Sequence, residues 1–297
     1  QSEFVDDTDL SLIYWCNPGT VDLSLTENKN WTTFVDFHGP SNLESIHITG
    51  ENLEKSTNRV LRSLINCDKF TYVSRTQRCY WIGALTAIGI DPSQSYGPII
   101  NLASNCKRIN YKANEQIKFV FAGGWHPWLM DEELLLSVSE TIEKLDNSSL
   151  HILGGPHKFC EDKFQNLEKK LRSFSKTYLE GFLSHEKYIK FLSDGVCLLD
   201  IFSRSFERKI AISTRSFETI NLGVPLIHPK WSELSDHIFE YKNGWVYENE
   251  STLLQRIIAL DKNPSSLIEA SANSVKAKDN LFNYGRSLNE MGKCFDS

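Results

Sequence analysis

The feature that most constrains this chain is an alternation of strand and helix patterns from about residue 117 to about residue 260. Its first member, residues 117–122, reads IKFVFA and is followed by Gly123-Gly124. A run that is apolar at every position is typical of a parallel strand buried on both faces. Strand and helix patterns then alternate about five times. This order predicts an α/β chain with a doubly wound parallel sheet, whose ligands bind at the carboxyl ends of the strands.

Turn, cap and glycine signals bound the individual segments. In the repeating part we expect strands at 117–122, 150–153, 177–182, 195–200, 221–228 and 244–247, and helices at 131–145, 160–174, 184–192, 213–222, 234–241 and 251–260. Upstream of it we expect strands at 31–37 and 69–73, and helices at 51–67 and 76–88.

The length of 297 residues leaves room for two ordinary domains. A polar connector at 101–114 separates the upstream elements from the alternation. We therefore expect a first domain at 1–114, which is short for a complete one, and a second at 115–277. Residues 278–297 are expected to form a helix that returns to the first domain.

Charge and cysteine usage exclude several classes of protein. A net charge of −6 without a basic arm argues against a nucleic-acid binder, and no apolar run approaches the ~20 residues that span a bilayer. Seven scattered cysteines without a CxxC pair indicate free thiols and a reducing cytoplasm. A basic cluster at 169–172 is either a solvated helix face or a peripheral contact with the inner face of a membrane.

A loop and helix junction near residue 213 carries the clearest candidate site. Ser213 or Thr214 can cap a helix that Gly223 ends, and Arg215 and Glu218 lie three residues apart on one face. The amino end of such a helix attracts phosphate, Arg215 can hold a diphosphate, and Glu218 can accept two hydrogen bonds from a sugar diol. The alternative is a surface ion pair between the two side chains.

Small and basic residues follow the neighbouring strands. Glycine pairs at 123–124 and 154–155 let a ligand approach the backbone, but neither matches a dinucleotide or P-loop pattern. Positive charge for a phosphate is available from four side chains: Lys158, Arg204, Arg208 and Arg215.

Five segments of this half resemble the donor-binding domain of retaining GT-B glycosyltransferases. The matching segments read FVFAGGWHPW, LHILGGP, YLEGFLSHEKYIKFLSD, TRSFETINLGVPLI and DHIFEYKNGWVY, and they cover a little under half the chain. Upstream, WTTFVDFHGPSNLE and CDKFTYVSRTQRCYWIGALTAIG resemble a bacterial subgroup of that family. The resemblance implies a GT-B-like fold of two Rossmann-like doubly wound parallel-sheet domains, the N-terminal one short or incomplete.

The resemblance also implies roles for matching residues. Glu218 would hold the ribose, Arg215 or its loop neighbours the diphosphate, and residues 180–182 the base. Many relatives have a second Glu separated from the ribose Glu by seven residues, whereas Glu207 is separated from Glu218 by ten. The candidates are Arg215, Arg208 and Glu207 for catalysis, Gly123, Gly124, Lys158, Gly181, Phe182 and Glu218 for the nucleotide, and Trp125 and His126 for the substrate. Trp125 either stacks on a sugar or packs as an aromatic plug at the domain interface, and His126 either contacts substrate or packs.

The implied activity is the transfer of a sugar from a nucleotide diphosphate-sugar to a glycan or lipid-linked glycan acceptor of the O-antigen, capsule or cell-surface polysaccharide type. The resemblance implies retention of configuration. No cofactor or metal is expected, since arginine and lysine can stabilise the leaving diphosphate. Two alternatives stay open: an epimerase or phosphorylase of the same shape, and a module that binds a sugar or nucleotide without turnover. Nucleotide affinity distinguishes the non-catalytic module from the enzymes, because a module that serves only as a scaffold binds nucleotide weakly or not at all.

Overall fold

The computed structural model describes residues 12–27, 31–100, 107–112, 114–158, 160–281 and 283–296. It divides into two compact units, of which unit 1 comprises residues 1–103, 210–212 and 284–297 and unit 2 comprises residues 104–209 and 213–283. The division falls between Ala103 and Ser104, within the polar connector expected at 101–114. Residues 101–106 and 113 of the expected connector lie outside the described residues.

Unit 1 is built on a parallel sheet whose described strands follow the order β1-β2-β3. Its described elements are β1 (Leu12–Trp15), α1 (Leu23–Thr26), β2 (Thr32–Phe37), α2 (Ser41–Thr49), α3 (Leu53–Leu64), β3 (Lys69–Tyr72), α4 (Arg75–Ala87), α5 (Pro92–Ser95) and α14 (Tyr284–Asp296). An aromatic stack fills its core, with the Phe37 ring centroid 5.3 Å from that of Tyr72 and 4.4 Å from that of Trp81. The strands expected at 31–37 and 69–73 are confirmed within a residue at each end.

Unit 2 contains a six-stranded parallel sheet in the order β6-β5-β4-β7-β8-β9. The strands are β4 (Ile117–Trp125), β5 (Ser148–Pro156), β6 (Thr177–Gly181), β7 (Val196–Leu199), β8 (Leu226–Pro229) and β9 (Gly244–Tyr247). The chain builds outward from β4 in one direction and then, from β7, in the other. This is the doubly wound order that the alternation of strands and helices predicts, and it places a crevice outside the carboxyl ends of β4 and β7.

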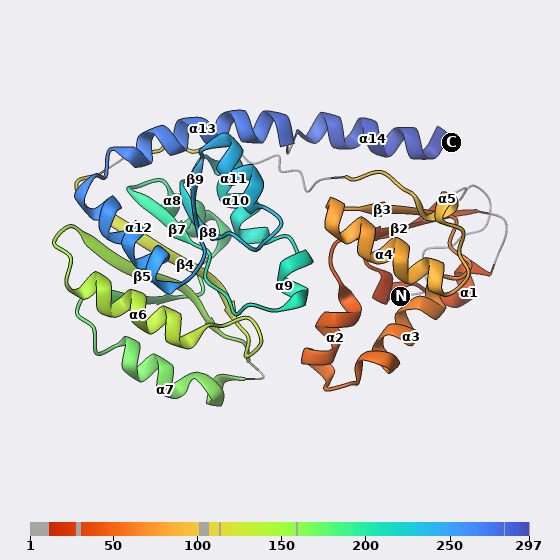
Figure 1. The fold of residues 1–297 in the computed structure, drawn as a ribbon, viewed down its shortest axis with the longest axis horizontal. Coiled ribbons are helices and arrows are strands. Elements are labelled where there is room, and N and C mark those ends of the chain that lie inside the picture. The colour runs from red at the N-terminus through yellow and green to blue at the C-terminus, as the bar shows by residue number, and fades with distance from the viewer. Residues whose placement is uncertain are drawn as a thin grey trace. The chain divides into compact units, whose positions relative to one another are not determined.

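Helices enclose this sheet on both faces (Figure 1). They are α6 (Glu132–Glu143), α7 (Glu161–Leu171), α8 (His185–Leu192), α10 (Thr214–Leu222), α11 (Ser235–Tyr241), α12 (Glu250–Lys262) and α13 (Ser266–Leu281). The short helix α9 (Phe206–Ile210) lies between β7 and α10 in the sequence. The apolar residues of α6, α7 and α12 share one core cluster with the strands, so these helices cover the same face. Among the described helices, none is long and apolar enough to cross a membrane.

One sequence expectation for this unit was wrong. The strand expected at 221–228 begins at Leu226, because Asn221 still belongs to α10 and donates its side-chain amide to the Phe217 carbonyl at 2.9 Å. Gly223, at φ 81°, ends the helix in a left-handed turn that favours glycine. Residues 278–297, expected to form a C-terminal helix, contain the end of α13 (Ser266–Leu281) and α14 (Tyr284–Asp296), which is part of unit 1.

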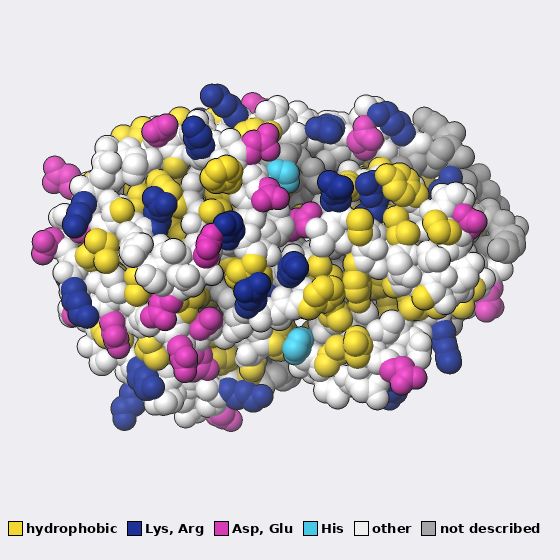
Figure 2. Space-filling model, in the orientation of Figure 1, with side chains coloured by type: hydrophobic (Ala, Val, Ile, Leu, Met, Phe, Trp, Pro, Cys, Tyr) yellow, Lys and Arg dark blue, Asp and Glu magenta, His cyan; other side chains and the backbone are white. Residues whose placement is uncertain are grey.

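Charged side chains of both signs are interspersed on the face of unit 2 that Figure 2 shows. The net charge of the whole chain is −6. Among the described residues on this face, no basic patch of the kind that attracts a nucleic acid stands out.

Candidate functional site

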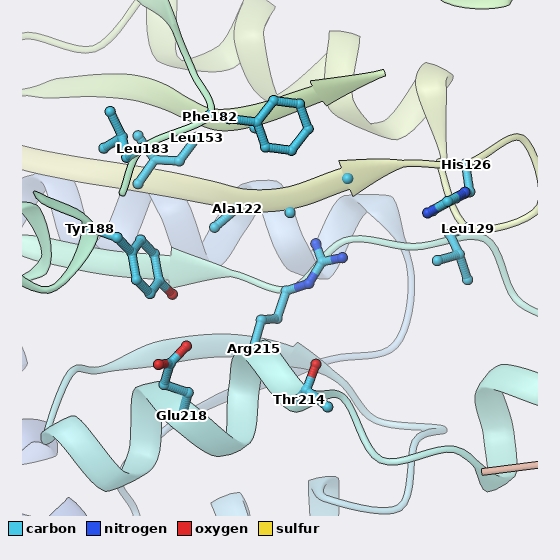
Figure 3. Close-up of a pocket in the computed structure, with 13 residues that line it drawn as sticks. Ala122, His126, Leu129, Leu153, Phe182, Leu183, Tyr188, Thr214, Arg215 and Glu218 are labelled. Atoms are coloured by element: carbon cyan, nitrogen blue, oxygen red, sulfur yellow. The ribbon is translucent and has the colours of Figure 1, made fainter. Parts of the chain in front are cut away.

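A cavity of about 430 Å³ opens at the carboxyl ends of the unit 2 strands (Figure 3). Residues from β4 and β5, the segments that follow β4 and β6, and helices α8 and α10 converge on it. Its lining consists of Ala122, Gly123, Gly124, His126, Leu129, Leu153, Gly154, Phe182, Leu183, Tyr188, Thr214, Arg215 and Glu218. The cavity therefore lies on the sheet edge where the doubly wound order predicts a ligand.

Helix α10 presents its first turns to this cavity. Ser213 is the N-cap, and its side chain accepts a hydrogen bond from the Ser216 amide. Because the helix begins at Thr214, Arg215 and Glu218 fall on one face, and Figure 3 shows both side chains extending from α10 on the side of the strands. Among the described contacts, Arg215 pairs with Asp200 and Glu218 with His185. The alternative of a surface ion pair between Arg215 and Glu218 is therefore not the arrangement that forms.

Arg215 is packed on several sides. Its Cζ lies 5.2 Å from the Phe121 ring centroid, and its Nε lies 3.6 Å from Asp200 Oδ1. Gly123, with φ 125°, passes so close that a Cβ there would lie 2.9 Å from Arg215 Nη2. The glycine at the end of the apolar run thus makes room for the guanidinium. Arg215 is therefore a planar cation held in place near the carboxyl end of β4.

Asp200, directly after β7, carries the charge that faces this cation. Burial raises the pKa of Asp200, but the hydrogen bond and charge of His228, together with Arg215, hold the pKa at about 2. Asp200 and His228 are both completely buried. The carboxylate is therefore ionised at neutral pH and anchors Arg215 from the protein interior.

Glu218 faces a different part of the cavity. Its side chain is 27% exposed, and its Oε1 lies 2.9 Å from His185 Nε2 on α8. Burial and the neighbouring Glu218 raise the pKa of Tyr188, so this phenol stays neutral. Phe182, in the segment after β6, is 70% exposed and also lines the cavity. A carboxylate with an exposed aromatic ring is a combination that can hold a sugar diol and a flat base.

His126 lines the cavity in the segment that follows β4. Its ring centroid lies 4.6 Å from that of Trp128 and 5.1 Å from that of His157. Burial lowers the pKa of His126, and the positive charges of His157 and Arg215 lower it further. The imidazole is therefore neutral at pH 7 and can exchange a proton when an anion enters the cavity.

The cavity brings together six of the sequence candidates: Gly123, Gly124, His126, Phe182, Arg215 and Glu218. The others lie outside its lining. Gly181 ends β6 with φ 70°, and Lys158 is exposed on the turn after β5. Glu207 and Arg208 bind each other on α9, and the Glu207 side chain is 2% exposed. These two are therefore engaged with one another and not with the cavity.

Trp125 does not offer its ring to a sugar. It is 1% exposed and packs edge-on against Phe164 of α7, with ring centroids 5.6 Å apart. The structure shows Trp125 packed in the core of unit 2, a role that the sequence analysis did not consider for it. Within the described residues, no three His, Cys, Asp or Glu side chains converge as a metal site would require.

Sequence reasoning missed several residues of this region. Tyr188 and Thr214 line the cavity, while Asp200 and His228 lie behind Arg215. One signal was available for Asp200: it is the first charged residue after the apolar strand that Val196–Leu199 forms. A buried carboxylate at the carboxyl end of such a strand needs a partner, and Arg215 on α10, the second helix after β7, was already a candidate.

Neither a protein-family model nor a curated protein matches the chain. Solved structures do match its fold. TarM aligns with a TM-score of 0.71 at 17% identity, over 96% of this chain and 55% of TarM. HepE of Anabaena, in complex with UDP and glucose, aligns with a TM-score of 0.74 at 12% identity, over 97% of this chain and 78% of HepE. Sucrose-phosphate synthase from Thermosynechococcus elongatus aligns with a TM-score of 0.73 at 14% identity, over 96% of this chain and 73% of the synthase.

These likenesses show that the chain has the GT-B fold, as its sequence motifs predicted. The chain spans little more than half the length of TarM. At 12% to 17% sequence identity, these alignments establish the fold, whereas the chemistry depends on the side chains of the site.

Proposed function

We propose that this protein is a glycosyltransferase that moves a sugar from a nucleoside diphosphate donor to a glycan acceptor. The observation that carries the proposal is that Arg215 and Glu218, on one face of α10, line a single cavity with Phe182 at the carboxyl edge of the sheet. A cation, a carboxylate and an exposed ring match the three parts of a nucleotide: diphosphate, ribose and base. The HepE structure, which shares the fold, holds UDP and glucose, and this supports a uridine donor.

The donor diphosphate would lie against Arg215 and the backbone of Gly124, near the amino end of α10. That end carries backbone N–H groups and a positive dipole, both of which favour a phosphate. Glu218 would accept the ribose hydroxyls, for which it would exchange its contact with His185. Phe182 would stack on the base. The sugar would then extend toward His126, the polar residue next to Leu129 in the lining.

The proposed chemistry requires cations but no protein nucleophile. The bond between the sugar C1 and the diphosphate oxygen breaks, a bond between C1 and the acceptor oxygen forms, and the departing diphosphate takes up the acceptor proton. Arg215 stabilises the negative charge that develops on the leaving group. If the acceptor enters from the face that the diphosphate leaves, the configuration is retained. We propose that no metal takes part, and that the acceptor is a cell-surface glycan or its lipid-linked precursor, met in the cytoplasm or at the inner face of a membrane.

The test is turnover of a matched donor. A thermal-shift screen against UDP, GDP, CDP and dTDP selects the nucleotide, because a ligand that binds the folded state raises its melting temperature. The corresponding nucleotide sugars are then incubated with the protein and glycan acceptors, with and without EDTA, while released nucleoside diphosphate is measured. We expect release that depends on the acceptor, survives EDTA and falls strongly in Arg215→Gln. Binding without release would favour the non-catalytic alternative, and a changed sugar on the same nucleotide would favour an epimerase.

A further inference from the structure

A closed polar cluster lies behind Arg215. It joins the residue after β7 to α10 and β8, and its members are Asp200, Ser216, His228 and Ser232. Ser216 donates to Asp200 Oδ2, which also lies 3.0 Å from His228 Nδ1. The other ring nitrogen of His228 lies 2.9 Å from Ser232 Oγ.

All four side chains are nearly or completely buried, and none of them lines the cavity. Burying a carboxylate is costly unless it is paired and hydrogen-bonded, so a fold that needed only an apolar core would not place one here. Among the contacts between described residues, the cluster meets the cavity lining through Arg215, whose Nε lies 3.6 Å from Asp200 Oδ1. Whatever the cluster does for a ligand, it does through this arginine.

Two polar atoms of this contact are not satisfied by hydrogen bonds. Arg215 Nη1 and Asp200 Oδ1 are both buried, and neither has a hydrogen-bond partner among the described residues. The guanidinium is instead held by the charge of Asp200 at Nε, by the Phe121 ring and by the close backbone of Gly123. Its orientation is therefore set while its hydrogen-bonding capacity is incompletely used. That is the state expected of a preorganised anion-binding group.

We infer that Asp200 is a positioning residue that acts through Arg215 and fixes its guanidinium to receive the donor diphosphate. Ser216 and His228 in turn hold the carboxylate that does this. The inference rests on the proposed function of the cavity and extends it to residues that do not touch the ligand.

Two other roles for Asp200 make different predictions. A counter-charge would weaken the attraction between Arg215 and a phosphate, so removing it would strengthen diphosphate binding. A purely structural role would act on the whole unit, so its loss would affect every ligand and would add to the effect of an Arg215 substitution. A positioning role predicts weaker diphosphate binding, with no further loss once Arg215 is gone.

The experiment is a double-mutant cycle of Asp200→Asn and Arg215→Gln, with UDP and uridine as the probes in calorimetric competition. We expect Asp200→Asn to weaken UDP binding roughly tenfold, the order of coupling seen between contacting residues, and to leave uridine binding unchanged. In the Arg215→Gln background, Asp200→Asn should change UDP affinity less than twofold. Asp261→Asn is the matched control, because Asp261 is also a buried carboxylate and accepts from Ser148 Oγ at 2.6 Å, at the opposite end of the sheet.

A second variant covers the case in which Asp200→Asn fails to fold, as judged by its melting transition. Ser216→Ala keeps the carboxylate and removes one of the groups that hold its Oδ2. It should lower UDP affinity in the same selective way, by a smaller factor. Stronger UDP binding, an equal loss for uridine, or additive effects with Arg215→Gln would overturn the inference. Any of these three outcomes refutes the positioning role alone, provided that the unmodified protein binds UDP and that Arg215→Gln weakens UDP binding. If no nucleoside diphosphate binds, the proposed function fails as well.

Discussion

The guanidinium of Arg215 lies where a side chain on Gly123 would have to be. A Cβ at Gly123 would come within 3.1 Å of Arg215 Cζ and 2.9 Å of Nη2, and the φ of 125° is itself one that L side chains rarely adopt. Gly154 on the neighbouring strand repeats the pattern, because its Cβ would meet the Gly123 carbonyl oxygen at 2.2 Å. Gly123 and Gly154, near the carboxyl ends of β4 and β5, thus keep two backbones and one cation close together.

Gly123→Ala should therefore damage the site and the fold together. The backbone strain alone costs about 1–3 kcal/mol of unfolding free energy, and the displaced guanidinium should weaken UDP binding at least tenfold. Denaturant unfolding and calorimetry measure the two effects. Gly50→Ala is the control, since Gly50 has φ 70° with no atom within 4 Å of its Cβ position. That variant should show strain without loss of UDP binding, and an equal loss in both variants would contradict the steric argument.

Glu218→Ala should weaken the ribose contact. We expect UDP and uridine to lose affinity by about 1–3 kcal/mol, the range for removing a partner of a charged hydrogen bond. In the unmodified protein, 2′-deoxy-UDP should bind more weakly than UDP, whereas Glu218→Ala should bind the two alike. Glu186→Gln, an exposed carboxylate in the first turn of α8, is the matched control. A persistent preference for UDP in Glu218→Ala would place the ribose elsewhere.

His126 should take up protons when a diphosphate binds. Its pKa lies below 6.5 because burial and the charges of His157 and Arg215 disfavour the imidazolium. An anion beside His126 favours the imidazolium, so UDP should bind more tightly as the pH falls below 6.5. Calorimetry in buffers of different ionisation enthalpy measures the uptake, and His126→Gln separates it from the protonation of UDP itself. An unchanged proton count in His126→Gln would show that the bound diphosphate does not act on the pKa of His126.

His38 in unit 1 gives a pH dependence of stability. Its hydrogen bond to Asp36 raises its pKa above 6.5, burial opposes this, and the charge of Asp36 adds to the rise. A folded pKa above the unfolded one contributes stability at pH values below about 6.5, and this contribution is lost as the pH rises through the folded pKa. The unfolding free energy of the unmodified protein should therefore fall more between pH 6 and 8 than that of His38→Gln. Equal slopes in denaturant unfolding would contradict the assignment.

The sequence predicted the parts of this site that depend on local rules. Residues 117–122 are apolar at every position, which leaves a buried parallel strand as the simplest interpretation. Ser213 and Gly223 bound α10 as a cap and a left-handed stop, and this fixes Arg215 and Glu218 on one face before any tertiary contact is known. Strand order and cap chemistry are enough to place that face at the carboxyl edge of the sheet.

The direction of individual side chains depends on packing that the sequence does not display. Lys158 follows β5, and Arg208 follows β7 as Arg215 does, yet Lys158 is exposed outside the cavity lining and Arg208 binds Glu207. The burial of Trp125 follows from the alternation of side chains along a strand. β4 extends to Trp125, which therefore lies on the same face as the core residues Phe119 and Phe121. The burial of Asp200 against His228 depends on β7 and β8 being neighbours, and no local pattern shows this.

The most direct test of the account is a calorimetric titration of UDP into the unmodified protein, Arg215→Gln and Arg172→Gln. Arg172, an exposed arginine at the end of α7, is not part of the cavity lining. We predict one UDP site per chain, at least a tenfold loss of affinity in Arg215→Gln with uridine binding little changed, and no loss in Arg172→Gln. Unchanged UDP affinity in Arg215→Gln, or no binding of UDP, GDP, CDP or dTDP to the unmodified protein, would contradict the account.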